Sequence, residues 1–329
     1  VRRVLQLVDR AAKNKKDGEK ADYDHAHKVA RKASDEVIVL LKNEDNILPL
    51  NNDLKIAVIG EQATDVMQGG GCAKLSPERL NTPLDEIRKS SSNVTFAPGY
   101  ATEEVDQVLI DEAVAVAKDT EVAIVFVGTT WKIESEGFDR AHMRIADSHL
   151  ALLSEVTKVN KNVIVMLSSG STVEVHQFEK DVKGIFHLWY PGQAAGQSIA
   201  DILFGKVSPS GKLSETFPVC LENTPTYKSE GESDVEVEYK EGLFIGYRYY
   251  DSKKIPTQYP FGHGLSYTTF AYSNIQLSKK TLKNNDVLEV SVDISNTGKM
   301  TGKEAVQVYV HDVESQYTRP NKELKAFAK

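Results

Sequence analysis

The 329-residue chain has few cysteines, no excess of basic residues and no long hydrophobic run. Its longest apolar runs, around 122–128 and 163–167, are much shorter than the roughly 20 residues that a membrane helix needs, so no membrane segment is predicted. The net charge of -7 argues against a nucleic-acid partner, because nucleic-acid-binding surfaces usually carry a clustered basic excess. The 40% hydrophobic and 26% charged residues are typical of an ordinary globular protein.

The two cysteines, Cys72 and Cys220, lie far apart and have neither a metal-ligand spacing nor the pattern of a disulfide framework. Two free thiols favour a reducing compartment, so a cytoplasmic protein is expected. The first residue is Val1, so the chain is expected to begin within a longer sequence, and a signal peptide ahead of it stays open. We expect no metal and no organic cofactor.

Hydrophobic periodicity divides the chain into four predicted parts. Residues 1–50 are predicted to be a linker and helix from the end of a preceding domain, with a long helical pattern over 22–43. Residues 51–218 alternate strands with helices of 10–15 residues, which predicts a parallel sheet covered by helices on both faces. Residues 219–265 are rich in proline, glycine and tyrosine and are predicted to be a connector. Residues 266–329 alternate apolar with polar residues, which predicts antiparallel strands.

The second part is an α/β domain with a regular order of elements. Its strands are predicted at 55–60, 94–97, 122–128, 162–168 and 184–190. Its helices are predicted to begin at Thr82, as an N-cap before Pro83, and to cover 103–118, 148–160 and 194–204.

The stretch 134–140 follows directly on the apolar run 122–128. A run this apolar, without alternation, predicts a strand buried on both faces, and ligands of open α/β sheets bind beyond the carboxyl ends of such strands. A carboxyl group there can act as a general acid if its surroundings raise its pKa. The alternative is a solvated acidic loop with a helix-capping aspartate.

Several stretches together resemble glycoside hydrolase family 3, of the multidomain β-glucosidase type. They lie at 32–50, 68–73, 134–140, 189–193, 200–205, 209–213, 216–218, 246–251 and 261–267. Each is weak alone, but their order and spacing are specific, and the resemblance covers about 30 to 329. It implies an N-terminal barrel with an aspartate nucleophile, an α/β sandwich with the acid/base glutamate, and a bracing fibronectin type III-like domain. The last domain is expected to be incomplete, because such a sandwich needs about 100 residues.

The resemblance implies a retaining β-glycosidase, with glucose as the favoured sugar, that hydrolyses terminal non-reducing β-D-glycosides by double displacement. Its substrates would be oligosaccharides or aryl and alkyl β-glycosides, and its partner in catalysis would be the barrel domain of the same enzyme. Retaining glycosidases place two carboxyl groups about 5–5.5 Å apart, so the chain without the barrel is expected to be inactive. A homo-oligomer, and a non-catalytic carbohydrate-binding or scaffolding module, remain alternatives.

Through its acid-glycine-aromatic motif, which ends at Phe138, the resemblance places Glu136 at the acid/base position, with Glu134 as the runner-up. Gly137 lets the backbone turn so that the acid can face the cleft. Glu134 would lie on the same side if the loop is extended. Asp139 and Arg140 are expected to support this loop through charge-assisted bonds, with capping of the next helix by Asp139 as the alternative.

Three further features bear on the same region or on possible ligands. Trp131, five residues before Glu136, is predicted either to face the leaving-group sugar or to anchor packing. The glycines 69–71 match neither common phosphate-binding motif, which disfavours a nucleotide site and leaves a cleft-edge loop. Position 72 is expected to hold a small, buried residue, here Cys72. His263 is expected to be a buried, hydrogen-bonded imidazole rather than a metal ligand.

Overall fold

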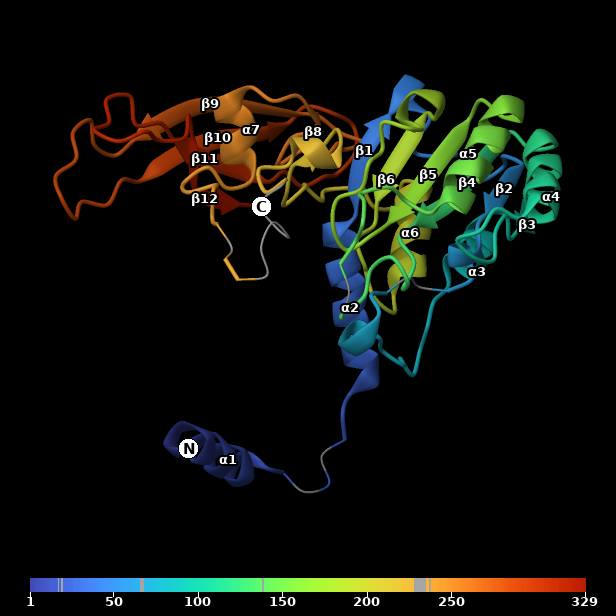
Figure 1. Cartoon of the computed structure of the whole chain (residues 1–329), viewed down its shortest axis with the longest axis horizontal. Coiled ribbons are helices and arrows are strands. Elements are labelled where there is room, and N and C mark those ends of the chain that lie inside the picture. The colour runs from blue at the N-terminus through green and yellow to red at the C-terminus, as the bar shows by residue number, and fades with distance from the viewer. Residues whose placement is uncertain (17, 19, 66–67, 138, 228–234, 237) are drawn as a thin grey trace.

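The structure is a computed structural model that describes residues 1–329 except 17, 19, 66–67, 138, 228–234 and 237. Its largest part is built on a six-stranded sheet with the strand order β1-β6-β5-β4-β2-β3 (Figure 1). The strands are β1 (Val39–Asn43), β2 (Ile56–Ile59), β3 (Val94–Ala97), β4 (Val122–Gly128), β5 (Val163–Ser168) and β6 (Gly184–His187). Strands β2 to β6 run parallel, and β1 pairs antiparallel with β6.

The prediction of one helix over 22–43 is wrong at its C-terminal end. Helix α2 (Tyr23–Val37) ends at Val37, six residues earlier than predicted. The chain then continues as the edge strand β1, in which Val39 pairs with His187. The sheet is therefore mixed rather than wholly parallel. It also begins before residue 51, inside the segment predicted to be linker and helix.

Helices cover both faces of the sheet, as the alternation of elements predicts. Helices α3 (Pro83–Ser90) and α6 (Ala195–Leu203) pack together on one face, and α4 (Gln107–Lys118) and α5 (Asp147–Val159) on the other. Successive side chains of a strand point to opposite faces, so β4 contributes to two cores. Ala123, Val125 and Val127 belong to the core under α4 and α5, whereas Val122, Ile124 and Phe126 belong to the core under α3 and α6.

The helix signals near residue 82 are also confirmed. Thr82 is the N-cap of α3 and its hydroxyl accepts the backbone N–H of Asp85 at 3.2 Å, with Pro83 in the first helical position. Such a cap satisfies a backbone donor that the first helical turn otherwise leaves free.

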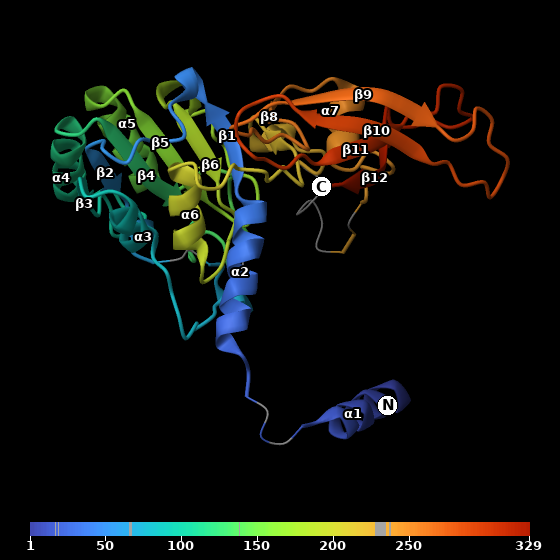
Figure 2. The same cartoon turned by 180° about the vertical axis from the view of Figure 1, so that it is seen from behind.

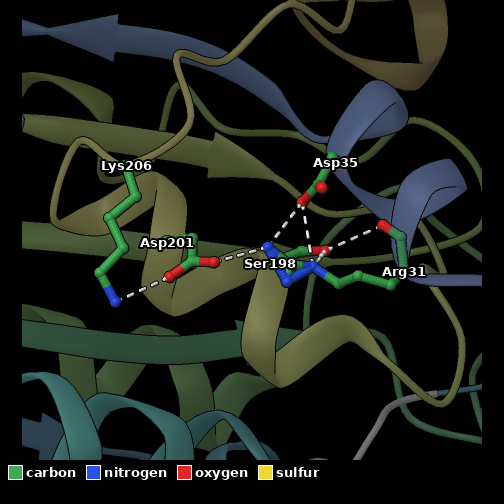
Figure 3. A network of polar contacts seen from close by, with 5 residues as sticks. All are labelled: Arg31, Asp35, Ser198, Asp201 and Lys206. Carbon is green, nitrogen blue, oxygen red and sulfur yellow. Dashed lines mark hydrogen bonds and ion pairs between the residues drawn. The ribbon is translucent and has the colours of Figure 1, made fainter. Parts of the chain in front are cut away.

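A polar network holds α2 against α6 at the edge of the sheet (Figure 3). The Arg31 guanidinium bonds to Asp201 at 2.7 Å, to Ser198 at 2.9 Å and to Asp35 at 3.2 Å, and Lys206 lies 3.1 Å from Asp201. Partial burial raises the pKa of Asp35, against the lowering effects of Ser198 and Arg31. The network therefore fixes the helix from which β1 continues. Helix α1 (Arg2–Asn14) lies apart in both views and has no buried residue (Figures 1 and 2).

The C-terminal part consists of short antiparallel pairs, as its alternation predicts. The connector holds α7 (Tyr247–Lys253) and the strand β8 (Thr257–Tyr259), which pairs with β7 (Phe217–Pro218) at the end of the preceding part. Beyond it, β9 (Phe270–Leu277) pairs with β10 (Val290–Asn296), and β11 (Val306–Val310) pairs with β12 (Glu323–Ala328). These strands are mostly half-buried or exposed. Among the described residues, no helix combines the length and apolar character that a membrane crossing requires.

Candidate active site

Three loops meet at the carboxyl end of the parallel strands, where the sequence predicts the site. We call residues 129–146, which follow β4, the acid loop; residues 68–73, in the connection that follows β2, the glycine loop; and residues 169–172, which follow β5, the β5 loop. The acid loop lies between the other two and bonds to both. Its turns lie at 131–133 and 136–137, on either side of Ser135, and the placement of both glutamates on one side stays a prediction.

Glu134 forms hydrogen bonds with residues of all three loops. Its Oε2 accepts the Thr129 hydroxyl at 2.9 Å and the backbone N–H of Gly170 at 3.1 Å. Its carbonyl accepts the N–H of Gly70 at 3.2 Å, and the Tyr190 hydroxyl lies 3.1 Å from Thr129 Oγ1. A Cβ on Gly170 would come within 2.2 Å of Glu134 Oε1, so glycine is needed for this close approach.

Glu136, two residues along, is exposed. Its Oε2 accepts the backbone N–H of Cys72 at 2.9 Å, and that bond holds the pKa of the carboxyl below its ordinary value, because it favours the charged form. Gly137 has φ +87 with open space around it, so the predicted backbone turn is present. Phe138 lies outside the described residues. The acid/base role of Glu136 stays a prediction.

Arg140 joins the acid loop to the β5 loop. Its Nη1 donates to Ser171 Oγ at 2.7 Å and to the Thr172 carbonyl at 3.3 Å. Nearby, burial raises the pKa of Glu215, partly offset by the Thr172 N–H and by the charge of Arg140. Helix α5 begins at Asp147 with Ala146 as its N-cap, so capping by Asp139 is wrong. Support of the loop by Asp139 and Arg140 stays a prediction.

Trp131 lines a hollow of about 690 Å³ beside the acid loop. Its side chain is 63% exposed, which does not fit a packing anchor; sugar binding stays a prediction. A second hollow, of about 710 Å³, lies at the opposite end of the sheet, between α5 and residues 177–183. No residue of the acid loop lines that second hollow, so we assign it no part in the site.

Sequence reasoning missed the residues that hold Glu134. Gly170 and Tyr190 follow other strands, and only the resemblance of 189–193 pointed to Tyr190. The burial expected of Cys72 is wrong: the residue is exposed, and its backbone N–H bonds to Glu136 of the acid loop. His263 is half-buried, and its Nε2 lies 2.8 Å from the Leu41 carbonyl. In the part of the chain that the structure describes, no group of three or more metal-ligating side chains occurs.

Comparison with known proteins gives one consistent result. Thermostable beta-glucosidase B of Acetivibrio thermocellus is 47% identical over the whole chain, which covers 44% of that protein. An exo-alpha-(1->6)-L-arabinopyranosidase of Bifidobacterium longum is 39% identical over 95% of the chain, which covers 42% of that protein. The crystal structure of a GH3 beta-glucosidase of Bifidobacterium adolescentis matches 98% of the chain with a TM-score of 0.92 and 40% identity, over 48% of that structure.

The chain thus spans less than half of the length of these relatives. The family models agree with its two-part architecture. Residues 304–329 match the fibronectin type III-like domain, which fits the small C-terminal sheets. Residues 38–267, well over half of the chain, match the glycosyl hydrolase family 3 C-terminal domain, so the chain belongs to glycosyl hydrolase family 3.

Proposed function

We propose that this chain supplies the general acid/base of a retaining β-glycosidase, with Glu136 as that group and β-glucosides as the favoured substrates. The nucleophile would be an aspartate of a barrel domain in the same enzyme. The observation that carries the proposal is the presentation of Glu136: an exposed carboxyl group at the carboxyl edge of the sheet, on a loop that is anchored on both sides. β-Glucosidases among the relatives support the choice of sugar.

In the proposed mechanism, Glu136 first protonates the departing glycosidic oxygen. It then takes a proton from the water that hydrolyses the glycosyl-aspartate intermediate. A donor must hold its proton near the working pH, yet the Cys72 N–H lowers the pKa of Glu136 in this chain. Burial beneath the barrel, and a nucleophilic carboxylate about 5–5.5 Å away, would both raise that pKa. We therefore expect a higher pKa for Glu136 in the full-length enzyme than in this chain.

Glu134, the runner-up, is assigned a supporting role. Its Oε2 already accepts two hydrogen bonds from the protein, so proton transfer through that oxygen would break the contacts that hold the loop. The exposed Glu136 bonds only to Cys72 of the glycine loop, through the backbone N–H and the side chain of that residue, among the contacts that the described residues make.

The test is Glu136→Gln in the full-length enzyme. With a substrate whose leaving group needs protonation, kcat should fall by about 10²–10⁴-fold, the usual contribution of general acid–base catalysis. Added azide should restore turnover of an activated aryl β-glucoside and give a β-glycosyl azide, because azide attacks the intermediate without base assistance. Glu104→Gln, at an exposed acid outside the acid loop, is the matched control and should keep the parent rate.

Two results would contradict the proposal. One is an unchanged rate in Glu136→Gln. The other is hydrolysis of an aryl β-glucoside by this 329-residue chain alone that Glu136→Gln abolishes, since the nucleophile would then lie within the chain.

A further inference from the structure

We propose that the hollow beside Trp131 is a carbohydrate subsite that takes the distal sugar units of the leaving group, beyond the bond that is cleaved. This role presupposes the proposed function, in which the leaving group departs past Glu136. Binding of a sugar in the hollow is a separate property, which needs no catalysis and is tested without it.

The position of the hollow in the fold supports a binding site. From β2 the chain first moves outward to β3, then returns to the other side of β2 to form β4, so the direction of winding reverses between β2 and β4. In open α/β sheets, ligands bind at the carboxyl ends of the strands where this reversal opens a crevice. Residues that follow β2, β3 and β4 line the hollow, among them Gln62, Glu103 and Trp131.

The floor of the hollow is polar and rigid. The Tyr100 hydroxyl accepts the backbone N–H of Gln62 at 3.3 Å and donates to the Phe126 carbonyl at 2.9 Å. The ring of Tyr100 packs 4.0 Å from that of His149, centroid to centroid. His149 Nδ1 lies 3.0 Å from the Gly128 carbonyl, and burial lowers the pKa of His149 to about 4, so the ring is neutral at neutral pH.

Two polar atoms of this floor have no partner among the described residues. They are Nε2 of His149, a residue with no exposed surface, and Oε1 of Gln62. Buried polar atoms are almost always hydrogen-bonded, and an exception calls for an unseen group at that place. Both residues line one hollow, so the unpartnered polar atoms belong to its walls.

The rim carries an aromatic face and paired charges. Glu103 accepts the Thr130 hydroxyl at 2.5 Å and Lys132 Nζ at 3.1 Å. These bonds outweigh the raising effect of burial, so the pKa of Glu103 lies below its ordinary value. Lys132 Nζ also lies 5.9 Å from the centre of the Trp131 ring. Trp131 thus offers a flat apolar surface next to fixed hydrogen-bonding groups.

This combination selects a neutral polyhydroxylated ligand over an anion. Lys132 is already paired with Glu103. The charged residues that line the hollow have no positive excess: they are Glu61, Asp65, Glu103, Lys74 and Lys132. A sugar matches the site because its C–H face can stack on an aromatic ring while its hydroxyls bond to a few placed polar groups.

The glycine loop connects the hollow to the proposed acid. Gly70 and Gly71 line the hollow. A Cβ on Gly71 would come within 2.6 Å of Glu136 Oε2, and one on Gly70 within 2.1 Å of Ser135 Oγ. The hollow therefore begins beside the carboxyl group that would protonate the leaving group, and a β-linked chain of sugars can extend from there toward Trp131.

The test is a titration of this chain with cellotriose, followed by the indole N–H signals in NMR spectra. The chain has two tryptophans, and Trp189 packs edge-on against His187 at 4.2 Å, away from the hollow. We expect the Trp131 signal alone to shift, with saturation in the millimolar range. Glu103→Gln should weaken binding by about fivefold or more, on the scale of one charged contact. Trp131→Ala lacks the reporting indole, so its binding is followed through the backbone amide signals around the hollow, and it should weaken by a similar factor. Glu104→Gln is the matched control and should bind as the parent does.

The inference is overturned if cellotriose gives no saturable shift of Trp131, or if Glu103→Gln and Glu104→Gln bind equally. Thermal unfolding of each variant shows whether it is folded. In the full-length enzyme, Glu103→Gln should lower kcat/KM for cellotriose relative to an aryl β-glucoside by a similar factor, and an unchanged ratio would overturn the leaving-group role. The proposed function has a separate readout, the loss of turnover in Glu136→Gln, so either idea can fail without the other.

Discussion

The two ends of one short segment, at Glu134 and at Glu136, have opposite surroundings. Glu134 is tied to a hydroxyl and to backbone groups of the glycine and β5 loops. Glu136 is exposed and accepts one backbone N–H from the glycine loop. One carboxylate bonds within the loops, whereas the other is exposed and held by the glycine loop; under the proposed function the first positions the loop that carries the second. Positioning of this kind by supporting side chains is what a catalytic group requires.

The largest difference between the two ends should appear in stability. Glu134→Ala leaves the Gly170 N–H without its acceptor, whereas the Thr129 hydroxyl keeps Tyr190 as a partner, and one hydrogen bond to a charged group is worth about 1.5–3 kcal/mol. We expect the free energy of unfolding to fall by about 1.5–3 kcal/mol in urea titrations. Glu136→Ala, at an exposed side chain that loses its bond from the Cys72 N–H, is the matched comparison and should lower the midpoint less. Equal shifts in both variants would show that Glu134 does not anchor the loop.

A smaller loss is expected on the partner side of the same contact. In Gly170→Ala the new methyl group would lie 2.2 Å from Glu134 Oε1 and 2.7 Å from the Tyr190 ring, and overpacking of this kind costs about 1–3 kcal/mol. The combination with Glu134→Ala removes one of the two clashing groups. The double variant should therefore be more stable than the sum of the single effects by at least about 0.5 kcal/mol. Strict additivity would mean that the two residues do not share this contact.

Local sequence patterns predict much of the fold and fail where pairing is distant. The strands at 94–97 and 122–128 have their predicted bounds. The second is fully buried, and a buried parallel strand is a short, unbroken apolar run. The segment that became β1 is apolar too, and it continues a helical pattern. Its place in the sheet is decided by pairing with β6, more than 140 residues away. The periodicity of neighbouring apolar residues carries no information about such a distant pairing. The helix α7 and the strand β8 of the connector were not predicted, because the apolar residues there follow neither the helical nor the strand period.

The candidate site likewise combines features that local sequence predicts with features that depend on distant contacts. The position of the acid loop follows from one rule, that ligands bind beyond the carboxyl ends of parallel strands, and the motif singles out Glu136. The surroundings of Glu134 do not follow, because its partners come from loops after other strands. The exposure of Cys72 was also missed, since its contribution is a backbone N–H, a group that every residue except proline has. Side-chain chemistry is visible in a sequence, whereas backbone contacts depend on the fold.

The smallest effect is expected at the Glu136 end, where the contact is with one residue, Cys72. A Cβ on Gly71 would approach Glu136 Oε2 to 2.6 Å, so Gly71→Ala should push the carboxylate off the Cys72 N–H and raise its lowered pKa toward the ordinary value, as followed by NMR titration. Gly192→Ala is the matched control: Gly192 has φ +82, like φ +66 at Gly71, but open space around it. Both variants should lose about 1 kcal/mol from left-handed backbone strain, and only Gly71→Ala should change the titration of Glu136.

The sign of the pH dependence follows from the direction of the shift. A carboxyl group with a lowered pKa in the folded state stabilises the fold above the ordinary glutamate pKa, and this contribution is lost as the pH falls through the lowered value. In Gly71→Ala that acid-side loss should shrink, whereas in Gly192→Ala it should stay as in the parent chain. A titration of Glu136 that is the same in all three proteins would mean that the Cys72 N–H does not hold this carboxylate, and that the two ends of the segment differ in exposure alone.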